Sequence, residues 1–499
     1  MKKMKKILIL LAIAITIGGC DAGFEELNVN PTKPTQLSPG TKLTYVQLYT
    51  GGSNYVAYLF WNVIHLMPNV QQLNDTHYGP IFSYKKGHTH WLFEEQFKTT
   101  VKNIVDLEAQ LVASEEATAT ADLAIARIQK VLIFSRLTDA YGDIPYTEAG
   151  KGFLEGIRFP KYDKQSDIYA DMLATLEAAV VTLNSAGANS YGSADLLFGG
   201  DNAKWKKFAN SLMLRLAMRM VKVDDAAAQS WAAKAITGGV MTSNADIAYL
   251  QYEDSPDDRG PNVNPLTKCF TSRAPNQVKI SKTFMDFMKN RNDPRVSVLC
   301  STVSGDTTFA LQEGQAINDA TRGAANSKPN IAIFGGSGTI VYDAPFFFQT
   351  YAEVEFMLAE AAKRWGLAGG NAETHYNAGV RAAMGHLALY GHGVHVITNA
   401  EMDAYLLANP YVDANGIEMI NNQYWVATFG NGLESSSNWK RSGYPVLVPL
   451  NSAATLTGGE IPRRFVYPNS EKLNNPTNYE AAVVQMGGDE LTTRMWWDN

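Results

Sequence analysis

The segment ADLAIARIQKVLIFSRLTDAY at residues 121–141 decides the fold class, because its apolar residues recur at intervals of three and four positions. On a helix these residues share one face. The stripe consists of Leu123, Ala124, Ile128, Val131, Leu132, Ser135 and Leu137. Its small residues allow a second helix to approach closely. The segment therefore predicts a long helix buried among other helices.

The same periodicity recurs along the chain. It predicts further helices at 94–111, 167–183, 203–223, 225–236, 347–365 and 372–389. The fifth ends with Lys363 and Arg364 in its last turn, where carbonyl groups favour cations, and Gly366 can adopt the left-handed cap. A second helix follows a short polar link. We therefore expect an all-α fold of tetratricopeptide-like helix hairpins, with long irregular loops and few short strands, although no clean repeat motif is present.

Long stretches rich in Gly, Pro, Asn and Asp separate the predicted helices. They lie at 73–90, 249–276, 301–344 and 394–416. Loops of this length in a compact chain are usually functional or disordered. No change in composition marks a domain boundary within residues 41–499, so we expect one helical domain there.

The first loop combines aromatic rings with hydrogen-bonding side chains. Its rings are Tyr78, Phe82, Tyr84 and Trp91, and its polar residues are Asn74, Asp75, His77, His88 and His90. Rings can stack on the apolar faces of sugars while polar groups bind the hydroxyls. We predict a ligand face at this loop, completed by Tyr252 and Arg273. The alternative is that Trp91 simply begins the core helix.

The N-terminal segment MKKMKKILILLAIAITIGGC resembles a bacterial lipoprotein signal. A basic start precedes an apolar run from Ile7 to Ile17, which is shorter than a membrane-spanning helix. Two glycines then precede Cys20, as in a lipobox, although Ile17 stands where leucine is usual. We expect a signal peptide at 1–19, and at 20–40 a lipidated Cys20 followed by a flexible tether. The alternative is an ordinary signal peptide that happens to contain a cysteine.

The charge balance argues against a nucleic-acid partner. Loss of the signal removes four of the 43 Lys and Arg residues and leaves 39 against 49 Asp and Glu residues. An acidic surface is a poor ligand for phosphate. Besides Cys20, the chain has only Cys269 and Cys300, which could form a disulfide outside the cytoplasm or remain two separate buried thiols.

The sequence gives no positive indication of catalysis. GGSGT at residues 335–339 lacks the last glycine of a nucleophile elbow, and neither a phosphate loop nor a dinucleotide fingerprint is present. His88 and His90 could face one metal ion from an extended segment, but no further ligands are placed for zinc. The acidic loop at 253–260 does not have EF-hand spacing. We expect no cofactor, no metal and no enzymatic activity.

Several segments, in order over more than 400 residues, resemble the SusD/RagB family of outer-membrane lipoproteins. The segments are FEELNVNP (24–31), LTDAYGDIPYTEAG (137–150), WKKFANSLMLRLAMR (205–219), NDPR (292–295), TYAEVEFMLAEAAKRWG (350–366), NWKRSGYP (438–445), IPRRFVYP (461–468) and MWWD (495–498). The chain departs from the family at Lys440, where relatives more often carry arginine, and this puts a local ion pair in doubt. The motifs themselves look structural.

The resemblance implies a helical scaffold that binds nutrients at the cell surface without catalysis. It implies an oligosaccharide ligand, or a peptide in some branches, and a SusC-like TonB-dependent outer-membrane barrel as the partner. Asp21, Glu25 and Glu26 resemble the surface-export signals of such lipoproteins. A lipid-anchored glycoside hydrolase and a helical-repeat adaptor without a small ligand remain the alternatives.

Overall fold

The computed structural model describes residues 37–52, 55–75, 88–254, 262–273, 277–301, 327–330, 342–391, 393–449 and 455–499. The chain divides into two compact units, Met1–Ser38 and Pro39–Asn499, and the second contains all the helices and strands considered below. In the described part of the chain, no helix has both the length and the apolar character needed to cross a membrane.

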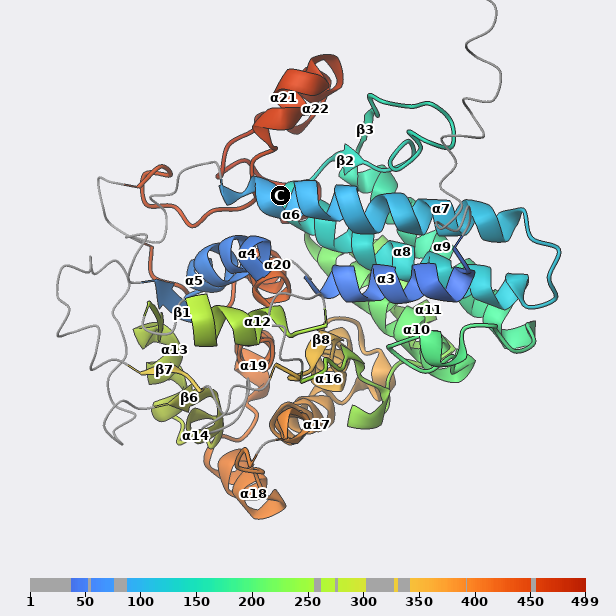
Figure 1. The fold of residues 1–499 in the computed structure, drawn as a ribbon. Coiled ribbons are helices and arrows are strands. Elements are labelled where there is room, and N and C mark those ends of the chain that lie inside the picture. The colour runs from blue at the N-terminus through green and yellow to red at the C-terminus, as the bar shows by residue number, and fades with distance from the viewer. Residues whose placement is uncertain are drawn as a thin grey trace, which may run out of the picture. The chain divides into compact units, whose positions relative to one another are not determined.

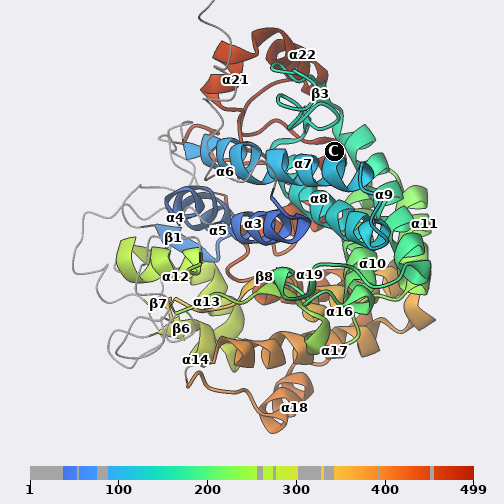
Figure 2. The ribbon, with the colours of Figure 1, turned by 45° about the vertical axis from the view of Figure 1, so that its right-hand side comes forward.

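The N-terminal half of the second unit is a set of long helices packed side by side (Figures 1 and 2). They are α3 (Pro39–Gly51), α7 (Lys102–Val112), α8 (Ala119–Tyr141), α9 (Gln165–Ser185), α10 (Asn202–Arg219) and α11 (Asp225–Gly238). Helix α8 contacts α7 and α9, and α10 contacts α9 and α11. Consecutive helices thus pack as hairpins, which confirms the predicted fold class.

Helix α8 occupies the middle of this set, and its sequence explains why. Apolar side chains occur on all its sides rather than on one stripe, so that Ile125, Phe134 and Leu137 are all fully buried. A helix that is apolar all round is stable only when it is covered all round. The prediction of a long buried helix at 121–141 is therefore confirmed.

The C-terminal half repeats the hairpin arrangement with α16 (Tyr351–Trp365) and α17 (Ala372–Gly385). A capping box between Thr350 and Glu353 starts α16, and Gly366 ends it in the left-handed conformation with φ of 67°. The predicted helix stop is thus confirmed. The other elements are α18 (Asn399–Ala408), α19 (Gly416–Ala427), α20 (Gly432–Ser442), α21 (Asn469–Asn474) and α22 (Pro476–Met486).

The remaining elements are short. The helical ones are α4 (Tyr55–Tyr58), a π-helix (Leu59–Leu66), α5 (Met67–Asn69), α6 (His90–Gln96), α12 (Pro265–Lys268), α13 (Lys282–Lys289) and α14 (Arg295–Leu299). The strands form four antiparallel pairs in the described residues: β1 (Leu73–Asp75) with β5 (Val278–Ile280), β2 (Ile144–Pro145) with β3 (Tyr162–Asp163), β4 (Ala248–Leu250) with β8 (Phe346–Gln349), and β6 (Cys300–Ser301) with β7 (Lys328–Pro329).

Two sequence expectations about elements were wrong. The helix expected at 347–365 begins only at Tyr351, because Phe346–Gln349 pairs with β4 and the Thr350 cap starts the helix after it. The loop expected at 394–416 contains α18, which begins with a second capping box, between Thr398 and Glu401. In both places the cap, rather than the spacing of apolar residues, fixes where the helix begins.

A group of buried charges joins the two halves. We call it the buried ionic network, and it consists of Asp139, Arg215, Arg219, Glu353 and Glu434. Arg219 bonds Glu434 at 2.6 Å and Asp139 at 3.2 Å, whereas Arg215 bonds Glu353 at 2.6 Å. Burial alone would raise the pKa of Glu434, but the two arginines lower it to about 2. The network therefore ties α8, α10, α16 and α20 together through paired charges.

All of these residues except Glu434, which lies just before NWKRSGYP, belong to the segments that carry the family resemblance, and this agrees with the structural role inferred for those segments. A second buried cluster has the same character, because Arg441 of α20 bonds Glu360 of α16 at 2.7 and 2.8 Å. The segment NDPR also folds into a buried pair, Arg295 with Asp293 at 2.6 Å. The residues that identify the family thus hold helices together.

Lys440 lacks, in the described part of the chain, the local ion pair that its departure from the family pattern put in doubt. Its amine is buried, lies 3.5 Å from the carbonyl oxygen of Asp139, and has no carboxylate within ion-pair distance in the described part of the chain. Burial lowers the pKa of this amine from 10.5 to about 7. The fold accommodates the lysine without an ion pair of its own.

Candidate functional site

A short stack of partly exposed aromatic rings lies at the start of α6. The indole ring of Trp91 lies nearly parallel to the ring of Phe60, with centroids 6.2 Å apart, and at 4.9 Å from the imidazole of His90. Phe60 comes from the π-helix at Leu59–Leu66, so two separate elements hold the stack. Partly exposed flat rings of this kind can pack against the apolar face of a ligand.

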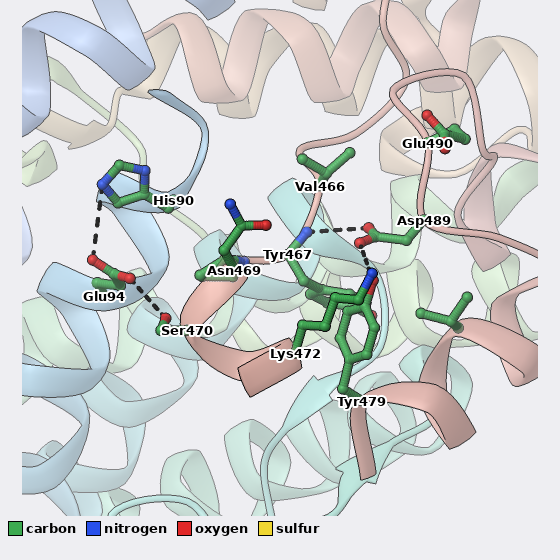
Figure 3. A pocket seen from close by; sticks show the side chains of 12 residues that line it. His90, Glu94, Val466, Tyr467, Asn469, Ser470, Lys472, Tyr479, Asp489 and Glu490 are labelled. Carbon is green, nitrogen blue, oxygen red and sulfur yellow. Dashed lines mark hydrogen bonds and ion pairs between the residues drawn. The ribbon is translucent and has the colours of Figure 1, made fainter. Parts of the chain in front are cut away.

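The stack borders a cavity of about 590 Å³ between α6 and the C-terminal segment (Figure 3). We call it the α6 cavity. It is lined by His90, Glu94, Val466, Tyr467, Pro468, Asn469, Ser470, Lys472, Tyr479, Val483, Asp489 and Glu490. Its volume lies within the range of sites that bind small molecules.

Hydrogen bonds fix both walls of the α6 cavity. On one side, Ser470 donates to Glu94 at 2.7 Å, and the Nε2 atom of His90 lies 3.8 Å from the same carboxylate. The side chains of His90 and Glu94 are 28% and 44% exposed, so both are open to a ligand from solvent. The wall thus offers donors and acceptors to a ligand (Figure 3), and the ring of Trp91 stacks on its His90.

On the other side, the carboxylate of Asp489 is occupied by three donors. It accepts hydrogen bonds from the backbone of Tyr467 at 3.1 Å, from Arg464 at 2.6 Å and from Tyr479 at 3.1 Å. Burial and the nearby Asp489 raise the pKa of Tyr479 to about 12, so this hydroxyl stays protonated at neutral pH. A carboxylate held in this way serves as an anchor for its neighbours. The arrangement suits recognition of a polyol better than proton transfer.

The structure brings together only two of the residues predicted for the ligand face, His90 and Trp91. The alternative interpretation of Trp91 also agrees in part with the structure, because its ring packs against the core and Trp91 is the second residue of α6. Tyr78, Phe82 and Tyr84 lie outside the described residues, as do the side chain of Arg273 and the predicted lipidation site Cys20.

Tyr252 does not fit the place given to it on the ligand face. Its side chain is only 3% exposed. Its hydroxyl oxygen lies so close to Gly51 that a Cβ atom added to Gly51 would be 2.5 Å from that oxygen. The residue is part of the core, because β4 carries the chain inward just before it. Burial raises the pKa of its phenol, as expected for a ring removed from solvent.

The sequence analysis missed the second wall of the cavity, which comes from Asn469, Ser470, Lys472, Tyr479 and Asp489. Ser470 and Glu94 are 376 residues apart in sequence, so no local pattern connects them. The available signal was the segment IPRRFVYP, which directly precedes Asn469 and was interpreted as structural. Its Arg464 does have a structural task, since it bonds the carbonyl oxygen of Tyr141 at 3.0 Å.

The described residues include both cysteines that follow Cys20 and the pair His88 and His90. Cys269 and Cys300 are both buried and form no disulfide with each other, so the interpretation of two separate thiols holds. No cluster of three or more potential metal-binding side chains occurs in the described part of the chain. His88 and His90 do not alternate on an extended segment, because α6 begins at His90. The centroid of the His88 ring lies 4.3 Å from that of the Phe60 ring.

Comparison with known proteins gives a consistent result. The family model of SusD-like proteins, described as starch-binding associating with outer membrane, matches residues 31–468. No curated protein matches. A solved chitin-binding protein is 32% identical, covers 93% of this chain and 100% of its own, and superposes with a TM-score of 0.82.

Two other solved structures are similar. A SusD-like protein of Bacteroidetes is 28% identical over 93% of this chain and 100% of its own, with a TM-score of 0.79. A chitin-binding SusD homologue from Flavobacterium johnsoniae is 23% identical over 92% of this chain and 98% of its own, with a TM-score of 0.74, and this likeness concerns the fold alone.

Proposed function

Because the chain belongs to the SusD-like family of starch-binding proteins that associate with the outer membrane, we propose that it captures an oligosaccharide at the cell surface. The observation that carries the proposal is the α6 cavity, where the partly exposed polar groups of His90 and Glu94 line the wall and the ring of Trp91 stacks on His90 at the border. Sugars present apolar ring faces and many hydroxyls, and this cavity offers a counterpart to each.

The proposal includes the location and partner of the protein. The chain is held at the outer membrane by lipid on Cys20, and it delivers its ligand to a SusC-like TonB-dependent barrel for uptake. Support comes from the lipoprotein signal in the sequence and from the description of the family. Permanent complexes of this kind bury roughly 2,000 Å² or more, so the pair should survive extraction in mild detergent.

The protein binds its ligand without cleaving it. Three carboxylates, Glu94, Asp489 and Glu490, line the α6 cavity. Asp489 is engaged by three donors, and Glu94 accepts one hydrogen bond from Ser470. A glycosidase needs one carboxyl group poised as an acid and a second free to attack or to activate water. Because its three donors keep Asp489 from acting as a free acid, base or nucleophile, the cavity favours binding over hydrolysis.

Titration of the detergent-extracted protein with chitohexaose and maltohexaose tests the binding function. We expect saturable binding of at least one of them and the same oligosaccharide, uncut, after overnight incubation. Shortened products would support the hydrolase. Failure to bind either sugar, together with binding of a mixed peptide library, would favour the peptide-binding branch of the family.

The partner is tested by purification through a tag on this chain from cells that also express a SusC-like transporter. We expect a barrel of much greater mass to copurify. Replacement of Cys20 by alanine should release the chain from the membrane fraction. Recovery of the chain alone under gentle detergent would contradict the proposed partnership, and continued membrane attachment of the variant would contradict the anchor.

A further inference from the structure

A second cavity, of about 280 Å³, lies where α13, α17, α18 and α19 meet. We call it the α18 cavity. Its walls include Phe287, Arg291, Tyr376, Tyr405, Asn409 and Asn422. None of these residues lines the α6 cavity. A role for the α18 cavity therefore needs an explanation of its own.

The α18 cavity has an aromatic surface next to a guanidinium group that lacks an ionic partner. The guanidinium carbon of Arg291 lies 3.9 Å from the centroid of the Phe287 ring, and its Nη1 donates to the carbonyl oxygen of Phe287 at 3.1 Å. Within the described ranges no carboxylate lies at ion-pair distance from Arg291. Since a guanidinium has five donor hydrogens, most of those on Arg291 are available to a ligand.

Asn422 contributes a buried polar atom without a partner. The residue is only 8% exposed, and its Oδ1 atom has no hydrogen-bond partner. Buried acceptors are almost always satisfied, because leaving one unpaired after removal from water is unfavourable. A hydroxyl group of a ligand in the cavity would supply the missing donor.

The walls of the α18 cavity are fixed in place before any ligand arrives. Arg295, paired with Asp293, donates to Gln423 at 2.6 Å, and Gln423 donates to the hydroxyl of Tyr405 at 2.7 Å. Asn409 donates at 3.0 Å to the carbonyl oxygens of both Arg291 and Tyr405. The family segment NDPR thus supports one wall of this cavity. Preorganised walls reduce the entropic cost of binding.

We propose that the α18 cavity is a second carbohydrate subsite, which holds one uncharged sugar residue. Phe287, Tyr376 and Tyr405 offer ring surface. The amide of Asn422 can both donate to and accept from hydroxyls, whereas Asn409, whose amide hydrogens already bond two carbonyl oxygens, can accept through its side-chain oxygen. Arg291 and Glu418 both line the cavity, so their charges balance and favour a neutral ligand. The inference rests on the proposed function, since it assumes that the protein binds glycans.

Calorimetric titration of the detergent-extracted full chain with chitohexaose and maltohexaose tests the subsite. We compare the wild type with Asn422→Ala and Arg291→Gln, each checked for an unchanged thermal midpoint. The matched control is Arg381→Gln on α17, because Arg381 bonds Asp403 and does not line the cavity. Asn422→Ala removes an oxygen that bonds nothing in the free protein, so the fold should tolerate it.

We expect both cavity variants to lose one binding event, or to bind at least about fivefold more weakly, while Arg381→Gln binds like the wild type. Wild-type affinity and stoichiometry in both cavity variants would overturn the inference. If the wild type binds neither sugar, the proposed function fails and the subsite fails with it. If Trp91→Ala removes all binding and the cavity variants change nothing, only the subsite is rejected.

Discussion

The buried ionic network and the α6 cavity use the same kinds of side chain under opposite conditions of exposure. In the network, Glu434 is 6% exposed and bonds two arginines. In the cavity, Glu94 is 44% exposed and bonds one serine and, at longer range, one histidine. A buried, fully paired carboxylate fixes helices, whereas a half-exposed one with spare lone pairs is available to a ligand.

The comparison teaches that the residues which identify the family and the residues which contact a ligand need not coincide. Asp139, Arg215, Arg219, Glu353 and Glu434 lie in or beside the recognisable segments and are buried. His90, Glu94 and Ser470 lie outside those segments and face the α6 cavity. Changes in the first group should therefore alter stability, and changes in the second should alter binding.

Glu434→Gln should have the largest effect. It removes the charge that Arg215 and Arg219 share and leaves two buried guanidinium groups undercompensated. Loss of one partner from a buried ion pair typically costs about 3 to 5 kcal/mol of unfolding free energy. Urea denaturation monitored by tryptophan fluorescence measures this cost. A loss below about 1 kcal/mol would show that the network does not hold the helices together.

The pH dependence of stability should reveal the buried amine of Lys440. Burial lowers its pKa in the folded protein from 10.5 to about 7. Between these two values the unfolded chain binds more protons than the folded one, so the unfolding free energy should rise as the pH increases.

Comparison with Lys440→Met isolates this contribution. From pH 7 to pH 9 the wild type should gain about 1 to 2 kcal/mol relative to the variant, because each pKa unit corresponds to about 1.4 kcal/mol. Denaturation curves of both proteins at the two pH values provide the measurement. Parallel behaviour of the two proteins would mean that Lys440 keeps an ordinary pKa in the fold.

Asp286→Asn should have the smallest effect and serves as the reference for exposed charges. Asp286 pairs with Lys282 one turn away on α13, and both side chains are about half exposed. Such pairs contribute about 0.3 to 0.5 kcal/mol. The same denaturation assay should therefore show almost no change. A cost similar to that of Glu434→Gln would remove the contrast between buried and exposed pairs.

The helical scaffold could be predicted from sequence because its signals are local. The spacing of apolar residues identified α8, and the cations near Gly366 identified the end of α16. Helix α18 was missed although Thr398 and Glu401 have capping-box spacing, because the surrounding residues have little amphipathic pattern. The start of α16 was misplaced because Phe347 pairs with a strand that is distant in sequence.

The candidate site could be predicted only on the side where ring and polar residues follow each other in sequence. The pattern pointed to His90, which lines the α6 cavity, and to Trp91, which stacks on it. The partner wall at Asn469 and Ser470 lies far along the chain, and only the folded structure brings it to Glu94. Tyr252 was misassigned because its loop composition suggested exposure, whereas β4 directs the segment into the core.

The most direct test of the account measures how tightly the Trp91→Ala variant binds the oligosaccharide that the wild type binds. Trp91→Phe and Trp231→Ala are measured beside it. Trp231 on α11 is also partly exposed but, unlike Trp91, does not stack on His90 at the border of the α6 cavity, so it is the matched control. With thermal midpoints unchanged, Trp91→Ala should weaken binding by about 1 to 3 kcal/mol, whereas the other two variants should bind nearly as well as the wild type. Wild-type affinity in folded Trp91→Ala would contradict the account and place the glycan elsewhere on the molecule.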